Sequence, residues 1–286
     1  MTSLTNAFNY CALAIRETFK RPSVLRAYLV FLSEGLLAGG IIVLLMAGCL
    51  AWLGTRIISL VLIGVLLGLL LISLLYLVVL LQTRVIRAYL QEQTQPTYEI
   101  PSFPGFKTEV LRYLLAYPWL PGKAAAGVAT SEANPDANKP PHWTRGKHLL
   151  LPVLTLHSGQ LEQAQDQIET QTLFKPLRFD PGQVNVHLLA WLAPLIFGLV
   201  GLLLGWLVAR GLISEPFVLV SSQILASALA MLVFLACFQP ALGLAGISLG
   251  FYHADLYRLE TYSEIPDGTQ FLPGLLGKIF SPQASS

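Results

Sequence analysis

Four long apolar segments constrain the fold of this chain more than any other feature of its sequence. They cover residues 27–53, 57–81, 188–209 and 217–252. At about 1.5 Å per residue, each is long enough to cross a hydrocarbon core about 30 Å thick. Only 12% of all residues are charged, about half the share of a typical soluble domain. The sequence therefore predicts an all-α, polytopic membrane protein with four transmembrane helices.

Short polar turns join these segments in pairs, which predicts two antiparallel hairpins. The first turn holds Gly54 and Arg56, and the second holds Arg210 and Pro216. The fourth segment is far longer than the roughly 20 residues that one crossing needs. Because Pro240 lies inside it, we expect the helix to kink or end there and the remainder to bend along or out of the membrane.

The N-terminal segment has the pattern of an amphipathic helix. Apolar residues at steps of three and four share one face: Leu4, Phe8, Cys11, Ile15 and Phe19. Polar residues fall on the opposite face: Asn6, Asn9, Arg16, Glu17 and Lys20. A basic amphipathic helix before a span is typical of an interfacial helix on the cytoplasmic leaflet. The alternative is an ordinary surface helix packed on the protein's own loop.

The segments between and after the spans are more polar. We expect an interfacial aromatic foot at 110–120, a shallow dip or bundle contact at 148–156, and a surface helix at 160–173 with Leu161, Ala164 and Ile168 in one stripe. The expected organisation is an interfacial helix at 1–26, a hairpin at 27–83, a cytoplasmic region at 84–187 with a flexible linker at about 122–147, a second hairpin at 188–252 and a cytoplasmic tail at 253–286.

The basic residues predict the topology. Of the 18 Lys and Arg residues, all but Arg56 and Arg210 lie outside the two hairpin turns. The positive-inside rule therefore predicts that both termini and the middle region are cytoplasmic. The first residues lack the pattern of a cleaved signal peptide, so we expect the N-terminus to be retained. The host would be a bacterial inner (cytoplasmic) membrane or a thylakoid.

Glu34 is the candidate intramembrane polar site, because it lies about two turns into the first span. A carboxylate at such a depth is costly and often marks an ion or proton pathway. The alternative is that Glu34 lies near the interface, where it reaches water or pairs with a basic residue such as Arg26. Its place near the cytoplasmic end of the span favours this alternative.

Four pairs of glycines have the spacing that lets helices approach closely. They are Gly35 and Gly39, Gly64 and Gly68, Gly201 and Gly205, and Gly246 and Gly250. Together they predict a closely packed bundle or contacts with partner helices.

The chain shows no pattern for a cofactor, a metal ion or nucleic acid. Its three cysteines are far apart, and none of its five histidines has ligand spacing. No phosphate-binding loop or nucleophile elbow is present. Asp255 and Arg258 are three residues apart and could pair on one helical face.

Three stretches resemble a family of uncharacterised bacterial multi-span membrane proteins, similar to the membrane domain attached to some glycerophosphodiester phosphodiesterases. They are the N-terminal helix followed by Lys20-Arg21-Pro22, the run from Leu149 to Leu154 with the polar helix after it, and Leu256-Tyr257-Arg258 with Ile265-Pro266. The resemblance implies a helical membrane protein and no particular activity.

Three functions fit these features. The first is a non-enzymatic accessory subunit or scaffold, whose partners are the lipid bilayer and either other membrane proteins or further copies of the chain. The second is a transporter or channel component that uses Glu34 and a helix interrupted at Pro240. The third is a lipid-modifying enzyme, for which the chain offers only His253, Asp255 and Glu260.

Overall fold

The computed structural model of the chain describes residues 2–54, 56–93, 104–116, 149–174, 182–212 and 219–262. Every regular element in these residues is a helix, and four helices are long and apolar enough to cross a membrane. These are α2 (Pro22–Leu53), α3 (Ile57–Gln93), α9 (Gly182–Leu212) and α10 (Leu219–Tyr262). The predicted all-α fold with four spans is confirmed. The expected linker at 122–147 and the tail beyond residue 262 lie outside the described residues.

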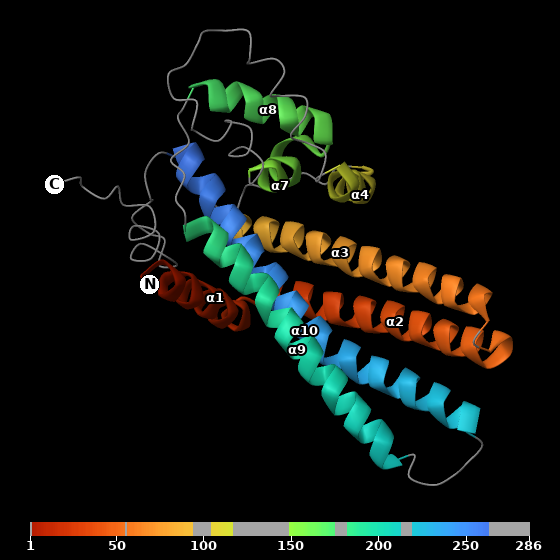
Figure 1. Cartoon of the computed structure of the whole chain (residues 1–286). Helices are drawn as coiled ribbons and strands as arrows, with labels where there is room; N and C mark the ends of the chain where they lie inside the picture. The colour runs from red at the N-terminus through yellow and green to blue at the C-terminus, as the bar shows by residue number, and fades with distance from the viewer. Residues whose placement is uncertain are drawn as a thin grey trace, which may run out of the picture.

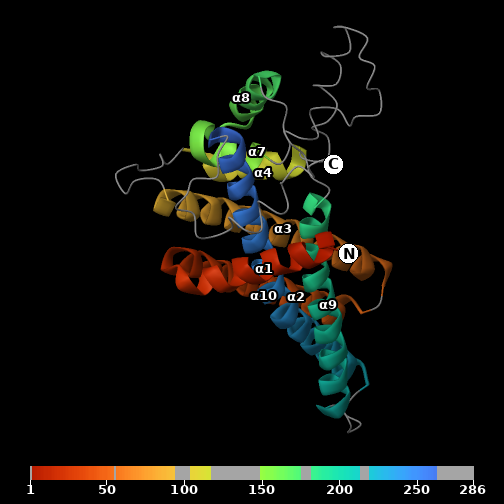
Figure 2. The same cartoon turned by 90° about the vertical axis from the view of Figure 1, so that its left-hand side faces the viewer.

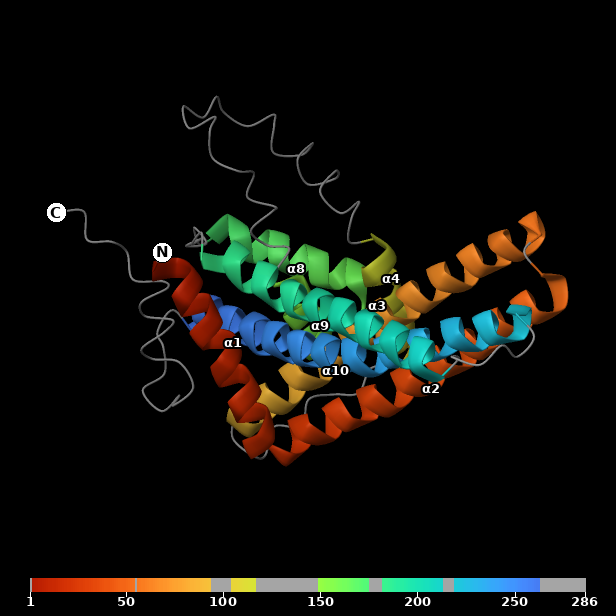
Figure 3. The ribbon, with the colours of Figure 1, turned by 60° about the horizontal axis from the view of Figure 1, so that its bottom comes forward.

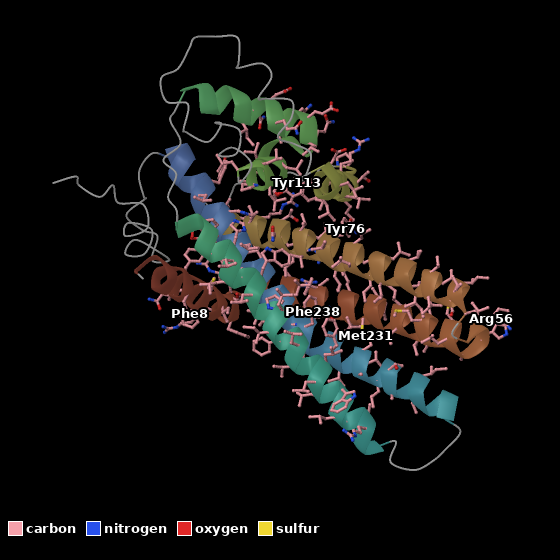
Figure 4. The ribbon with its side chains drawn as sticks, viewed as in Figure 1. Phe8, Arg56, Tyr76, Tyr113, Met231 and Phe238 are labelled. Carbon is pink, nitrogen blue, oxygen red and sulfur yellow. The ribbon has the colours of Figure 1, made fainter. Side chains whose placement is uncertain are left out.

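The four long helices form two antiparallel hairpins, α2 with α3 and α9 with α10; the end of α9 and the start of α10 lie at the same end of the molecule as the end of α2 and the start of α3 (Figure 1). Figure 4 shows Arg56 at the tip of the first hairpin. Toward the turns, the two hairpins diverge in both side views (Figures 1 and 2).

The remaining helices lie at the opposite end (Figure 2). They are α1 (Thr2–Lys20), α4 (Phe106–Ala116), α7 (Leu150–Val153), the π-helix η1 (Leu154–Ser158) and α8 (Leu161–Phe174). We call α4, α7, η1 and α8 the platform. Helix α1 and the platform therefore lie together, at the end of the four spans that is opposite to the hairpin tips.

Proline and glycine set the main helix boundaries. Arg21 is extended, with φ −109° and ψ 105°, and Pro22 opens α2. A residue before proline is driven out of the helical region, so this dipeptide makes the elbow between α1 and α2. Gly54 ends α2 with φ 61°, a positive φ that glycine adopts at little cost.

An exposed apolar band surrounds the outer part of the bundle. On α9 it runs from Leu188 to Val208, whose exposed fractions are 57% and 46%. These residues span about 30 Å along a helix, which is the thickness of a bilayer hydrocarbon core. On α2 the exposed band begins at Leu29, one turn after Arg26.

The sequence predicted that the helix would kink or end at Pro240; α10 continues through Pro240 to Tyr262, so it does not end there. Proline removes one backbone hydrogen bond and normally weakens a helix. Here the neighbouring helix α2 supplies other contacts: the Tyr28 hydroxyl donates to the Pro240 carbonyl at 3.2 Å. This contact ties α10 to α2 at the proline.

Helix α1 packs against α9, α10 and α2, through residues that lie outside the apolar face seen in the sequence. Its buried residues are Tyr10, Ala14 and Thr18, which recur every four positions. Two residues of the expected apolar face, Phe8 and Phe19, are instead 64% and 62% exposed. The small side chains of Ala14 and Thr18 let α1 approach the bundle closely.

The platform packs against α3 and α10. The described part of the run expected at 148–156 is a bundle contact, because Leu150, Leu151 and Leu154 are completely buried. The predicted stripe of Leu161, Ala164 and Ile168 on α8 is also buried, as expected. Helix α4 covers only part of the run at 110–120 expected to form an interfacial foot; it packs on α3, where the Tyr76 hydroxyl donates to the Lys107 carbonyl at 3.3 Å (Figure 4).

Candidate functional site

A buried carboxylate joins three helices where α1, α3 and α10 meet. Asp255 is 4% exposed and accepts two hydrogen bonds. The Tyr10 hydroxyl donates from α1 at 3.0 Å, and the Tyr89 hydroxyl donates from α3 at 2.8 Å. Tyr10 and Tyr89 are both completely buried. Because the two donors come from different helices, this cluster ties the N-terminal helix to the spans.

Aromatic side chains surround the carboxylate. Tyr10 meets Tyr252 edge to face with centroids 5.6 Å apart, and Tyr89 meets Phe251 in the same way at 5.0 Å. Such pairs stabilise a fold beyond their buried area. The Arg21 guanidinium lies over the Tyr89 ring, 5.1 Å from its centroid. We call Tyr10, Tyr89, Tyr252 and Asp255 the tyrosine–aspartate cluster.

The chemistry of the cluster suits a permanent structural contact between helices. Burial, and then the nearby Asp255 carboxylate, raise the pKa of Tyr10 well above its ordinary value of 10.0. The hydroxyl therefore stays protonated at neutral pH and continues to donate its hydrogen bond. Burial likewise raises the pKa of the Cys11 thiol from 9.0 to about 11, so this thiol is a poor nucleophile.

The histidines near the cluster do not form a metal site. The rings of His187 and His253 lie 5.5 Å apart. Among the described residues, however, no three His, Cys, Asp or Glu side chains are close enough together to hold a metal ion. His142 and His148 lie outside those residues.

Sequence reasoning singled out Asp255 but assigned it a different partner. The expected partner was Arg258, whose side chain lies outside the described residues. Tyr10 and Tyr89 are separated from Asp255 by 245 and 166 positions, so no local pattern could connect them.

A second polar contact ties α10 to α2 near Pro240. Gln239 is completely buried, and its Nε2 donates to the carbonyls of Phe31 and Leu32 at 3.0 Å each. Its Oε1 has no hydrogen-bond partner among the described residues. The side chain occupies the space beside Gly35, where any Cβ would overlap its amide nitrogen. Gly35 therefore makes room for a polar clasp between the two hairpins.

Glu34, the candidate intramembrane polar site, faces α3. Its carboxylate lies 3.7 Å from the Arg84 guanidinium, and both side chains are partly exposed. The basic partner is therefore Arg84 on the next helix, whereas the sequence suggested Arg26. A partly exposed ion pair of this length contributes little stability, typically up to about 1 kcal/mol.

Six of the eight glycines with helix-packing spacing lie against another helix of the same chain. A Cβ added at Gly39 would meet Leu235 at 2.9 Å, and one at Gly201 would meet Cys237 at 2.7 Å. At Gly205 it would meet the Cα of Ala230 at 2.7 Å, which is backbone. Gly35, Gly246 and Gly250 likewise face side chains of α10 or α3. These glycines allow the two hairpins and their helices to approach closely.

The remaining pair, Gly64 and Gly68, faces open space. Nothing lies within 4 Å of a Cβ built at either residue, and both are exposed. Three exposed residues lie on the same face of α3 because their spacing is i, i+4 and i+14: Ile57, Val61 and Leu71. We call these five residues the α3 outer face.

Comparison with known proteins identifies no relative from which a function could be transferred. No protein-family model, curated protein or solved structure matches this chain. Its function must therefore be inferred from the sites described above.

Proposed function

We propose that the chain is a non-enzymatic integral membrane protein that acts as an accessory subunit or scaffold and binds a transmembrane helix of a partner. The observation that carries this proposal is the α3 outer face. Gly64 and Gly68 have the same spacing as the pairs that pack inside the chain, yet no part of the described chain covers them.

Two properties of this face suit helix binding. The paired glycines expose backbone, which allows a second helix to approach closely without a side chain between them. Ile57, Val61 and Leu71 project around that flat strip, with exposed fractions of 80%, 60% and 57%. Alternating small and large side chains give a helix surface a shape that a second helix can complement.

The alternatives have less support. The transporter hypothesis needed a helix interrupted at Pro240, and α10 is continuous there. It also needed Glu34 as an isolated intramembrane acid, whereas Glu34 pairs with Arg84. For the lipid-modifying enzyme, His253 and Asp255 are 6% and 4% exposed, which hides them from lipid substrates. The Glu260 side chain lies outside the described residues.

The proposed orientation places both termini and the platform in the cytoplasm of a bacterial cell, or on the corresponding side of a thylakoid. The basic residues at the platform ends of α2 and α3 support this orientation, since Arg26, Arg84 and Arg87 all lie there.

Replacing both Gly64 and Gly68 with leucine tests the proposed function. In mild detergent, the unmodified chain should co-purify with a membrane protein in fixed proportion, or as an oligomer. The double variant should lose most of that association, because the leucines hold the partner backbone away. Native mass spectrometry of the purified particles measures the loss.

The control is Gly48→Leu on α2, where nothing lies within 4 Å of an added Cβ. This variant adds the same side chain at another exposed glycine and should keep the partner. A monomer without co-purifying protein in the unmodified chain, or equal loss in the control, would count against the α3 outer face.

A further inference from the structure

Helix α1 lies across the bundle at the level where the exposed apolar band begins. Figure 3 shows it running at a steep angle to α9 and α10. It contacts α10 through Tyr10 and Tyr252, and the His187 ring of α9 lies against Tyr252 with centroids 5.9 Å apart. On α9 the exposed apolar residues start at Leu188, directly after His187. Helix α1 is therefore at the depth of the bilayer surface, not inside the hydrocarbon core.

One face of α1 is fixed to the protein while the neighbouring face is apolar and exposed. Tyr10 donates to Asp255, and Ala14 and Thr18 are buried beside it. Phe8 and Phe19 are 64% and 62% exposed, and their separation of three turns puts them on one side of the helix. Figure 4 shows Phe8 on the outer side of α1. Like the band that begins at Leu188 on α9, these rings are apolar and exposed.

The exposed charges around this apolar strip are basic. Arg16, Lys20 and Arg26 are exposed. The one acid between Phe8 and Tyr28, Glu17, is paired with Lys20 at 2.7 Å and with Arg21 at 3.8 Å. Four basic residues and one acid leave a net charge of +3 (4 − 1) over residues 8–28. A basic surface beside an apolar strip at headgroup depth complements an anionic leaflet.

We propose that α1 and the first turn of α2 form a binding surface for the headgroups of anionic phospholipids. The phenylalanines enter the headgroup and acyl-chain boundary, and the three exposed basic side chains contact the negatively charged headgroups. The tyrosine–aspartate cluster holds the helix in the orientation that this contact needs. This surface is separate from the α3 outer face and does not depend on the proposed function.

Hydrogen–deuterium exchange of α1 in the full-length chain tests this inference. The chain is placed in nanodiscs of phosphatidylcholine alone, or of phosphatidylcholine with about one third phosphatidylglycerol, which gives an anionic surface. The amides of α1 should exchange more slowly in the anionic discs. The difference should shrink about fivefold for each of Arg16, Lys20 and Arg26 replaced with glutamine, since each near-surface cation contributes a factor of that size.

Two comparisons make the result decisive. Raised salt should remove the difference in the unmodified chain, because salt screens the attraction between exposed charges. This test uses no variant, so it does not depend on whether a variant folds. Replacing Arg56 and Arg210 at the hairpin turns should leave the α1 difference unchanged. Equal exchange in both kinds of disc, or a difference that survives salt and the triple replacement, overturns the inference. The first outcome would show that headgroup charge does not affect α1, and the second that the three basic side chains do not carry the effect.

Discussion

Asp255→Ala should lower the free energy of unfolding by about 2–6 kcal/mol, because it leaves two buried hydroxyls without their acceptor at about 1–3 kcal/mol each. Tyr10 and Tyr89 are both completely buried, so water cannot replace the carboxylate without rearrangement. Thermal unfolding of the purified chain in detergent measures the loss. Since Tyr10 is on α1, exchange of the α1 amides should also become faster than that of the spans.

A matched carboxylate serves as the control for this prediction. Glu162 is exposed on α8, so Glu162→Ala should leave the unfolding temperature nearly unchanged. Tyr10→Phe and Tyr89→Phe keep their ring contacts and each remove one donor, so each should cost less than Asp255→Ala. An Asp255→Ala variant as stable as the Glu162→Ala control would show that the cluster does not hold α1 in place.

Gly205→Ala is expected to separate α9 from α10 and to destabilise the second hairpin by about 1–3 kcal/mol, the usual cost of overpacking. The added Cβ would lie 2.7 Å from the Ala230 Cα and 2.8 Å from its carbonyl oxygen. Both atoms are backbone, so no side-chain rotation can relieve the contact. The unfolding temperature in detergent again measures the effect.

Gly68→Ala is the control, because nothing lies within 4 Å of an added Cβ there. In the isolated chain it should be neutral or stabilising by up to about 1 kcal/mol, since alanine favours a helix over glycine. If Gly68→Ala destabilised the isolated chain as much as Gly205→Ala, the close approach of α9 and α10 would not explain the loss.

The spans could be predicted from the sequence because the bilayer imposes a simple requirement. A helix in hydrocarbon needs a continuous apolar surface, and the sequence shows four such segments. The ends of the helices could not be predicted in the same way. Helix α3 continues to Gln93, and α10 continues through Pro240, because the platform and α2 supply contacts that composition does not reveal.

The sites depend on contacts between distant segments. Gly35 and Gly64 each begin a glycine pair with the same spacing. The space beside Gly35 is filled by Gln239, whereas the space beside Gly64 is open. Only the arrangement of the helices distinguishes them. Tyr10 was assigned to neither face of the N-terminal helix, and it became central because α1 crosses α10 beside Asp255. Periodicity predicted that α1 is amphipathic, but not which face packs on the protein.

Photo-crosslinking in intact membranes tests the proposed role most directly. A photoreactive amino acid replaces Val61 on the α3 outer face, and in a parallel variant it replaces Leu44 on α2, which is 67% exposed. If α3 binds a partner helix, Val61 should give a protein adduct of defined mass and Leu44 should react with lipid. Lipid adducts alone at Val61, or equal protein adducts at both positions, would contradict the proposal.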